Sequence, residues 1–254
     1  MDYNGKVVAI SGGGRGIGYA MAKAFHAQGA KIALGDLKGA EQAAKDFDGF
    51  GGVLDVTNPD SVSRFVADAE KALGPIDVFV SNAGVFLDTN KREAAGTSDE
   101  AWATSFEVNV MGAVRTAREI VPSMRERGGG VFVIVASAAG LLSQVGGPAY
   151  TSTKHAAVAF AETLAIMHGD EGVQVVCVCP QAVNTPMLTD NASDDVNVAA
   201  ADGVVEPEDV AKATLAAIED KRFLALSHPE VVQYEQFRAA SREKWISAMR
   251  KFKP

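Results

Sequence analysis

The sequence predicts an α/β fold, a single doubly wound parallel sheet of seven strands with helices on both faces and a helical tail at the C-terminus. Three observations support this fold class. Short runs rich in β-branched residues alternate with helical segments along the chain. Those runs are apolar at consecutive positions, which is typical of strands buried on both faces. No internal repeat or long linker interrupts the alternation, so we expect one main domain.

Seven runs are predicted strands, and signals at their ends place the helices between them. The runs are KVVAIS (6–11), KIALGD (31–36), GGVLDV (51–56), DVFVSN (77–82), GVFVIVAS (130–137), VQVVCVCP (173–180) and RFLALS (222–227). Asn58 followed by Pro59 predicts the cap and first turn of a helix. Thr97 with Glu100 predicts a capping box for a helix that continues to about residue 127.

The composition fits a chain with one sizeable core and disfavours several classes of partner. Of the 254 residues, 47% are hydrophobic, which is enough to bury such a core. The formal charge of −8 disfavours nucleic acid and anionic membranes, because both are bound by clustered cations. No apolar run approaches the ~18 residues that a membrane span needs, and the N-terminus lacks a signal-peptide pattern. We therefore expect a cytoplasmic protein without a membrane partner.

Cysteine and histidine positions give no sign of a disulfide or a metal site. Cys177 and Cys179 are one residue apart on a predicted buried strand, so their side chains share a face and cannot form an unstrained disulfide. The four histidines, at positions 26, 155, 168 and 228, lack the spacing of metal ligands. We interpret both cysteines as core residues and predict no metal.

Two segments depart from the alternation of strands and helices. Residues 181–206 have little periodicity and follow the carboxyl end of a predicted strand, where open α/β sheets bind ligands, so we expect a mobile substrate lid there. The segment from residue 229 onward has the pattern of one or two amphipathic helices. Its apolar anchors are Tyr234, Phe237, Trp245, Ile246, Met249 and Phe252. We therefore divide the chain into a main domain, 1–228, and a helical extension, 229–254, packed on that domain or on a partner subunit.

A glycine-rich turn, SGGGRGIG (11–18), joins the first predicted strand to the first helix. It lacks a G-x-G-x-x-G pattern but contains G-x-x-x-G-x-G at Gly12, Gly16 and Gly18. Glycines there permit a sharp turn and let a diphosphate approach bare amides at the positive end of the helix. A plain tight connection can have the same composition. The turn therefore indicates a Rossmann-like dinucleotide site only with a second signal.

Asp36 supplies that second signal. It ends the second predicted strand, where a carboxylate can accept hydrogen bonds from both ribose hydroxyls of the adenosine and repel a 2′-phosphate. This position favours NAD over NADP. Arg15 and Lys38 act the other way, because either cation could pair with a 2′-phosphate, yet Asp36 would remain beside it. NAD is the predicted cofactor, and NADP is the alternative.

The stretch YTSTK places Tyr150 and Lys154 one helical turn apart on the same face of a predicted helix. On an isolated helix such a pair is usually solvated. A nearby ammonium can nevertheless stabilise phenolate, which a free tyrosine with a pKa near ~10 hardly forms at neutral pH. The pair is therefore either a surface feature or a proton-transfer site.

Together these motifs resemble the short-chain dehydrogenase/reductase family over roughly residues 5 to 220. The glycine turn matches the family's cofactor turn, with serine at position 11 where threonine is commoner, and NAG (82–84) matches its fourth-strand signature. The resemblance implies that the main domain binds NAD and transfers a hydride. It implies cofactor contacts at Gly12, Arg15, Gly16, Ile17, Gly18, Asp36, Asp55, Val56, Asn82, Ala83, Gly84, Tyr150, Lys154, Pro180, Val183 and Thr185.

The resemblance also implies a catalytic tetrad of Asn109, Ser137, Tyr150 and Lys154, which occur in the family's order. Tyr150 would carry the proton, and Lys154, with the positive nicotinamide ring, would stabilise its phenolate and hold the nicotinamide ribose. Ser137 would hydrogen-bond the substrate oxygen, and Asn109 would hold a water that links Lys154 to solvent. These roles describe an alcohol dehydrogenase chemistry with tyrosine as acid and base.

The sequence departs from the family pattern at two places. Gln181 follows Pro180 where the family usually has glycine, which puts an amide near the expected substrate mouth. The helical tail replaces a glycine-rich ending that helps to build one of the family's two subunit interfaces. The segment HAAVAFAETLAIM (155–167) is apolar on nearly every side, as expected of a helix at the other interface. We expect a homodimer or a homotetramer.

The residues around the predicted site narrow the class of substrate. No lysine or arginine lies between Lys154 and Lys212, whereas ten acidic residues do, so a phosphate-bearing carrier is disfavoured. The predicted substrate pocket contains Phe86, Leu141, Gln181 and Met187, although core packing is an alternative for its apolar members. These walls favour a neutral, moderately hydrophobic secondary alcohol or ketone. Two other functions stay open, an NADPH-dependent carbonyl reductase and a non-catalytic dinucleotide-sensing binding protein.

Overall fold

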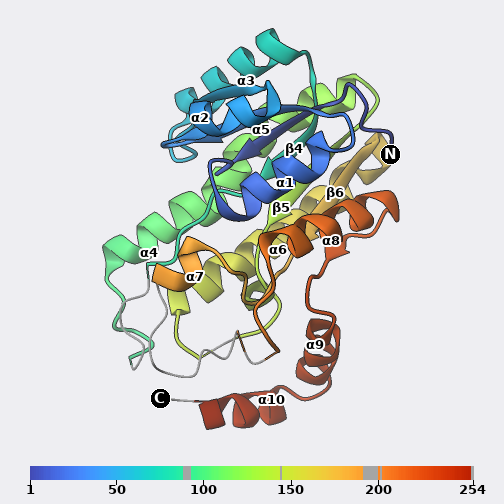
Figure 1. Cartoon of the computed structure of the whole chain (residues 1–254). Coiled ribbons are helices and arrows are strands. Elements are labelled where there is room, and N and C mark those ends of the chain that lie inside the picture. Colours follow the sequence, from blue (N-terminus) through green and yellow to red (C-terminus); the bar gives the residue numbers. More distant parts are fainter. Residues whose placement is uncertain (88–92, 144, 191–199, 201, 253–254) are drawn as a thin grey trace.

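The computed structural model shows one seven-stranded sheet with helices on both faces, as the sequence predicts (Figure 1). It describes residues 1–87, 93–143, 145–190, 200 and 202–252. The strands are all parallel and follow the order β3-β2-β1-β4-β5-β6-β7. Each predicted strand is present, at β1 (Val7–Ser11), β2 (Lys31–Asp36), β3 (Phe50–Val53), β4 (Ile76–Ser81), β5 (Gly130–Val135), β6 (Val173–Val178) and β7 (Leu224–Ala225).

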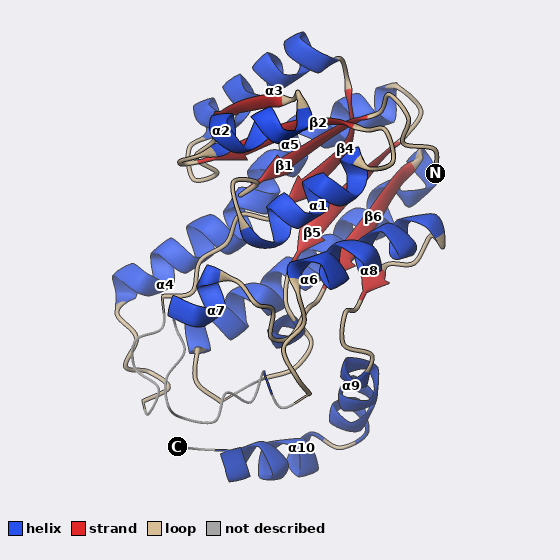
Figure 2. Ribbon diagram, in the orientation of Figure 1, coloured by secondary structure: helices blue, strands red, loops and turns tan. Residues whose placement is uncertain are grey.

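The helices lie between the strands and continue beyond the last one (Figure 2). Their bounds are α1 (Gly16–His26), α2 (Ala40–Ala44), α3 (Pro59–Leu73), α4 (Asp99–Phe106), α5 (Gly112–Glu126), α6 (Pro148–His168), α7 (Pro186–Asp190), α8 (Pro207–Glu219), α9 (Glu230–Ala240) and α10 (Arg242–Met249). The predicted cap of α3 is confirmed, because the Asn58 side chain accepts hydrogen bonds from the amides of Asp60 and Ser61. In the described part of the chain, no helix combines the length and apolar character that a membrane crossing requires.

Two hydrophobic cores lie on opposite faces of the sheet. In β1, Val7 and Ala9 belong to the core beneath α3, α5 and α6, whereas Val8 and Ile10 belong to the core beneath α1, α2 and α8. This alternation follows from the two-residue period of a strand. Burial on both faces explains why the strand sequences are continuously apolar rather than alternating.

The strand order creates a crevice at the carboxyl edge of the sheet. The chain moves from β1 outward through β2 and β3, then returns to pair β4 with the other side of β1. Loops that leave β1 and β4 therefore diverge, and open α/β sheets bind ligands at such a point. Most of the predicted cofactor residues lie at or after the ends of β1, β2, β3 and β4.

The prediction for the helix around Asn109 is confirmed in its extent and wrong in its cap. The cap is Ser98 rather than Thr97, because the Ser98 hydroxyl accepts a hydrogen bond from the Ala101 amide at 3.2 Å. The chain is helical from Asp99 to Glu126, as predicted, but a π-helical turn (Glu107–Met111) lies between α4 and α5. Such turns insert one extra residue into a helix and are frequent at functional sites. Asn109 lies within this turn.

The C-terminal tail is helical, as predicted, but only part of its apolar surface is covered. Trp245 is buried in the core that also contains Leu141 and Leu142, and its ring centroid lies 6.4 Å from that of Tyr234. Tyr234 and Met249 pack against this core. Three other predicted anchors, Phe237, Ile246 and Phe252, are 42%, 46% and 42% exposed. The domain boundary at residue 228 stays a prediction.

Trp245→Ala tests whether the tail is anchored to the main domain. Removing a buried tryptophan leaves a cavity and is expected to lower the free energy of unfolding by about 3–5 kcal/mol. Ile246→Ala is the matched control, because that neighbour is exposed and its loss is expected to cost about 0.5 kcal/mol or less. Chemical denaturation followed by circular dichroism measures both. Equal costs for the two variants would contradict the packing of Trp245.

Candidate active site

The glycine-rich turn is packed too closely for side chains at its motif positions. Gly12 has a φ of +64°, and a Cβ there would lie 3.0 Å from Asn82 Nδ2. A Cβ at Gly18 would lie 2.4 Å from the Gly12 carbonyl oxygen. Gly16 has a φ of +57°, and its Cβ would lie 3.4 Å from Thr185 Cγ2. The turn thus brings together predicted cofactor residues that follow β1, β4 and β6.

Hydrogen bonds fix the turn to the end of β4. The Ser11 hydroxyl oxygen accepts from the amides of Asn82 and Ala83, at 3.0 and 3.2 Å. The side-chain amide of Asn82 donates to the carbonyl oxygens of Ser11 and Gly12, at 3.1 and 2.9 Å. Ser11, which stands where the family more often has threonine, therefore keeps a hydroxyl that joins the loop after β1 to the loop after β4.

Asp36 lies at the glycine turn, where the sequence predicts the adenosine ribose. Its Oδ2 atom accepts a hydrogen bond from the Gly14 amide at 3.1 Å. Arg15 and Lys38 are both exposed. Bare turn amides at the start of α1 and a carboxylate at the end of β2 fit a dinucleotide with an unphosphorylated 2′-hydroxyl.

The remaining predicted cofactor positions border the same crevice. Asp55 turns one carboxylate oxygen toward Thr57, accepting from its amide and hydroxyl at 2.9 and 2.7 Å. Val56 and Val183 are buried, while Ile17 and Thr185 are half-buried. Pro180 accepts a hydrogen bond from the Ala138 amide at 2.8 Å. The contact between Pro180 and Ala138 places the segments after β5 and β6 beside each other.

Three of the four tetrad residues meet where α6 passes the end of β5. Lys154 Nζ lies 5.5 Å from the centroid of the Tyr150 ring and donates to the Val135 carbonyl oxygen at 3.1 Å. Ser137 is hydrogen-bonded to Tyr150. Lys154 and Ser137 are buried, and Tyr150 is half-buried. The pair on YTSTK is therefore not a solvated helix face.

Asn109 joins this group through the π-helical turn. Its Oδ1 atom accepts from the Val85 amide at 2.8 Å, and its Nδ2 atom donates to the Val85 carbonyl oxygen at 3.0 Å. Nδ2 also donates to the Thr153 hydroxyl at 3.1 Å. Asn109 thus binds the loop after β4 to α6. Thr153 lies inside YTSTK and is a member of this network that the sequence analysis did not single out.

Burial dominates the electrostatics of the tyrosine and the lysine. It raises the pKa of Tyr150, while the hydrogen bond with Ser137 opposes that rise and the neighbouring Cys179 adds to it. Burial also lowers the pKa of Lys154 to about 8, and the neighbouring Cys179 and Cys177 oppose that decrease. Both shifts have one cause, because a buried site disfavours the charged form of either group.

The predicted substrate residues differ in their surroundings. The Phe86 ring stands against that of Tyr150, with centroids 5.0 Å apart. Leu141 is buried in the hydrophobic core, Gln181 is half-buried and Met187 is 38% exposed. Part of the predicted lid, 191–199 and 201, lies outside the described residues. Phe86, one of the predicted substrate residues, therefore contacts the tetrad through Tyr150.

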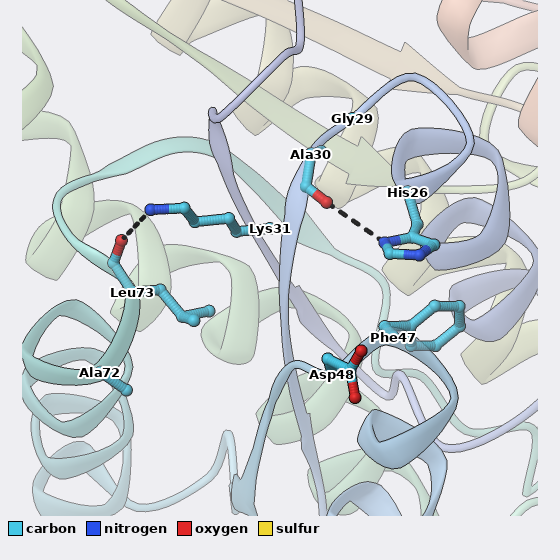
Figure 3. A pocket seen from close by; sticks show the side chains of 8 residues that line it. All are labelled: His26, Gly29, Ala30, Lys31, Phe47, Asp48, Ala72 and Leu73. Atoms are coloured by element: carbon cyan, nitrogen blue, oxygen red, sulfur yellow. Dashed lines mark hydrogen bonds between the residues drawn. The ribbon is translucent and has the colours of Figure 1, made fainter.

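The cysteines lie in the core near Tyr150 and Lys154, whereas the two described cavities lie apart from these residues. Cys177 and Cys179 are free and buried, with sulfur atoms 3.7 Å apart, which confirms them as core residues. One cavity of about 480 Å³ lies between the ends of α1 and α3 at the amino edge of the sheet, lined by His26, Lys31, Phe47, Asp48 and neighbours (Figure 3). The other is a shallow site between α5 and Glu171. Neither contains a predicted site residue, so we assign the chemistry to the carboxyl edge.

Comparisons with known proteins agree with this arrangement. The model of the short chain dehydrogenase family matches residues 6–196. A 3-alpha-(or 20-beta)-hydroxysteroid dehydrogenase of Mycobacterium bovis is 33% identical over 221 residues, which cover 85% of this chain and 84% of the relative. An uncharacterized NAD-dependent oxidoreductase of Mycobacterium tuberculosis is 39% identical over 140 residues, which cover 55% and 50%. A short chain dehydrogenase/reductase of Burkholderia phymatum, solved in complex with NAD, has a TM-score of 0.86 and 28% identity over 96% of each chain.

The lowered pKa of Lys154 predicts a specific dependence of stability on pH. Between pH 8 and the unfolded value of ~10.4, the folded chain holds fewer protons on this residue than the unfolded chain does. The contribution of Lys154 to the free energy of unfolding therefore rises with pH across this window. Lys154→Met is expected to reduce that slope, measured by urea denaturation at several pH values, whereas the exposed control Lys45→Met leaves it in place. The same slope in the wild type and Lys154→Met would show that the amine is not perturbed.

Proposed function

Because the chain belongs to the short-chain dehydrogenase/reductase family of oxidoreductases, we propose that it transfers a hydride between NAD and a secondary alcohol or its ketone. The observation that carries this proposal is the buried group in which Tyr150 contacts Ser137, Phe86 and Lys154. The hydroxyl groups of Ser137 and Tyr150 and the amine of Lys154 share one site at the carboxyl edge. Such a site can orient an alcohol and exchange its proton.

Each member of the tetrad has a role in the proposal. Ser137 binds and orients the substrate oxygen, and the Tyr150 hydroxyl accepts or returns the substrate proton. Lys154, with a pKa of about 8, exchanges a proton near neutral pH and favours the phenolate while it is charged. Asn109 holds the loop after β4 in place through its hydrogen bonds with Val85. We also propose that Asn109 holds a water that links Lys154 to solvent, a role that rests on the family resemblance. NAD, when bound, supplies the hydride acceptor.

The glycine turn, Asp36 and Thr185 are the proposed NAD site. Support comes from the close approach of the turn to Thr185 and from the Asp36 carboxylate at the same turn. The NAD-dependent oxidoreductase of Mycobacterium tuberculosis and the NAD complex of the Burkholderia phymatum protein add to this support. We extend the assignment to Arg15, Ile17, Asp55, Val56, Asn82, Ala83, Gly84, Pro180 and Val183.

The proposed substrate is neutral and moderately hydrophobic. Phe86 beside Tyr150 supports an apolar wall at the reacting carbon, and Leu141, Gln181 and Met187 complete the proposed pocket. The Mycobacterium bovis relative acts, by its name, on hydroxysteroids, which are hydrophobic alcohols. Exposed Ile166 and Met167 at the end of α6, 82% and 63% exposed, support a homo-oligomer. The oligomeric state and the cytoplasmic location stay predictions.

Tyr150→Phe tests the proton carrier. Loss of the hydroxyl is expected to lower kcat by about 10²–10⁴-fold, because it removes the acid and base but leaves the ring in place. Turnover is followed at the absorbance of reduced nicotinamide with a panel of secondary alcohols, and NAD binding by calorimetry is expected to persist. Tyr3→Phe, at the opposite edge of the sheet, is the control. Retention of most of the rate would exclude Tyr150 from this role.

Asp36→Asn tests the choice of cofactor. Replacing the carboxylate by an amide removes the repulsion of a 2′-phosphate and one strong acceptor for the ribose hydroxyls. The ratio of kcat/KM with NAD to kcat/KM with NADP is expected to fall about 10-fold or more. Asp48→Asn, an exposed carboxylate on the amino side of β3, should leave that ratio unchanged. A wild-type preference for NADP would favour the carbonyl reductase instead.

A further inference from the structure

A buried histidine lies beside the proposed substrate pocket and is used by no step of the proposed reaction. His228 follows β7 and is 2% exposed. Its ring contacts the segment after β6, because the Gln181 amide donates to His228 Nδ1 at 3.4 Å. The Ser227 hydroxyl lies 3.0 Å from the same nitrogen. His228 therefore holds the residue at which this sequence departs from the family's glycine.

The hydrogen bond from Gln181 indicates which tautomer the neutral ring adopts. A backbone amide can only donate, so Nδ1 is the acceptor and carries no proton. In the neutral ring the proton then resides on Nε2, which becomes a donor. Nε2 is buried and has no hydrogen-bond partner among the described residues. A buried donor without a partner is unfavourable and indicates that a polar group is to be bound there.

The Gln181 side chain presents the complementary group. Its Oε1 atom is also buried and without a hydrogen-bond partner in the described part of the chain. Donor and acceptor thus belong to two contacting residues but do not bond to each other. A hydroxyl group between them could accept from His228 Nε2 and donate to Gln181 Oε1. A carbonyl oxygen could satisfy only the histidine.

The two residues that carry these atoms are linked to the proposed reaction site through their other hydrogen bonds. Gln181 follows Pro180, whose carbonyl oxygen accepts from the Ala138 amide at 2.8 Å and from the Ser137 hydroxyl at 3.4 Å. One continuous series of contacts therefore links Ser137, which would bind the reacting oxygen, to His228. A ligand that reaches both ends must carry two oxygens on one carbon skeleton.

We propose that His228 and Gln181 bind a second hydroxyl group of the substrate, which makes the preferred substrate a hydroxylated secondary alcohol or hydroxyketone. This inference rests on the proposed function, since Ser137 and Tyr150 bind the first oxygen. It narrows the neutral, moderately hydrophobic class to compounds with one polar group away from the reacting carbon. His228 is then a specificity-determining residue rather than a catalytic one.

The test compares cyclohexanol with the 1,2-, 1,3- and 1,4-cyclohexanediols in the full-length chain. Calorimetry on Tyr150→Phe protein with NAD gives the Kd of each probe with turnover suppressed, and kcat/KM is measured on the unaltered enzyme. One of the diols is expected to bind about tenfold more tightly than cyclohexanol, because it satisfies two buried groups that the single alcohol leaves unpaired.

Variants of the two side chains assign the effect to them. His228→Leu is expected to raise the Kd of the favoured diol about tenfold while changing that of cyclohexanol less than about twofold. Gln181→Leu is also expected to raise the Kd of the favoured diol about tenfold. His228→Gln replaces the ring N–H donor by an amide N–H donor and should restore part of the preference. His26→Leu, an exposed histidine at the opposite edge, is the matched control and should change neither Kd.

The outcomes separate this inference from the proposed function. Equal Kd values for cyclohexanol and every diol, or a preference that survives His228→Leu, would overturn the hydroxyl site even if alcohols are oxidised. A diol preference that depends on His228, in a protein that oxidises no alcohol, would support the hydroxyl site and reject the proposed reaction. If His228 and Gln181 bind only water, the Kd values of cyclohexanol and of every diol will be equal.

Discussion

The side-chain amide of Asn82 fixes the geometry on which the rest of the site depends. It donates to the carbonyl oxygens of Ser11 and Gly12 and so fills the space between the loops that leave β1 and β4. A Cβ at Gly12 would lie 3.0 Å from its Nδ2 atom, and one at Gly18 would lie 2.7 Å from it. The glycine pattern is therefore required by internal packing as well as by any diphosphate. A side chain at either glycine would displace Asn82 and separate the two loops that it joins.

Burial of Tyr150 and Lys154 disfavours the charged form of each, although the proposed proton transfer uses both charged forms. The protein interior disfavours both phenolate and ammonium, so the pKa of Tyr150 is raised and that of Lys154 is lowered. The Ser137 hydroxyl opposes this for Tyr150, and the Val135 carbonyl oxygen accepts a hydrogen bond from Lys154. A lysine that titrates near pH 8 exchanges protons far more readily at neutral pH than a solvated one with a pKa of ~10.4. If Tyr150 is the proton carrier, Lys154 is suited to be part of a relay and not only a fixed cation.

Local signals made the carboxyl edge of the sheet predictable from the sequence. Strand runs, the glycine turn and the cap at Asn58 each depend on neighbouring residues, and the structure contains all of them. The helix around Asn109 was harder, because a π-helical turn has no sequence pattern of its own and is stabilised by the contacts of Asn109 with Val85 and Thr153. The cap at Ser98 rather than Thr97 is an error of one residue between two equally suitable hydroxyls. The roles of the tetrad come from the family resemblance, since no spacing alone could supply them.

The substrate side of the molecule depends on contacts that no local pattern encodes. Arg238 in α9 donates to His155 Nε2 on α6 at 3.2 Å, and the Tyr234 hydroxyl donates to Asp202 at 2.8 Å. Periodicity identified the tail as amphipathic, but it could not tell that Trp245 would be buried and Phe237 exposed, because both lie on plausible apolar faces. Each of these contacts joins the tail to a segment that is far away in the sequence. The carboxyl edge of the sheet can therefore keep its chemistry while changes in the tail alter what α6 and the segment before α8 present to a substrate.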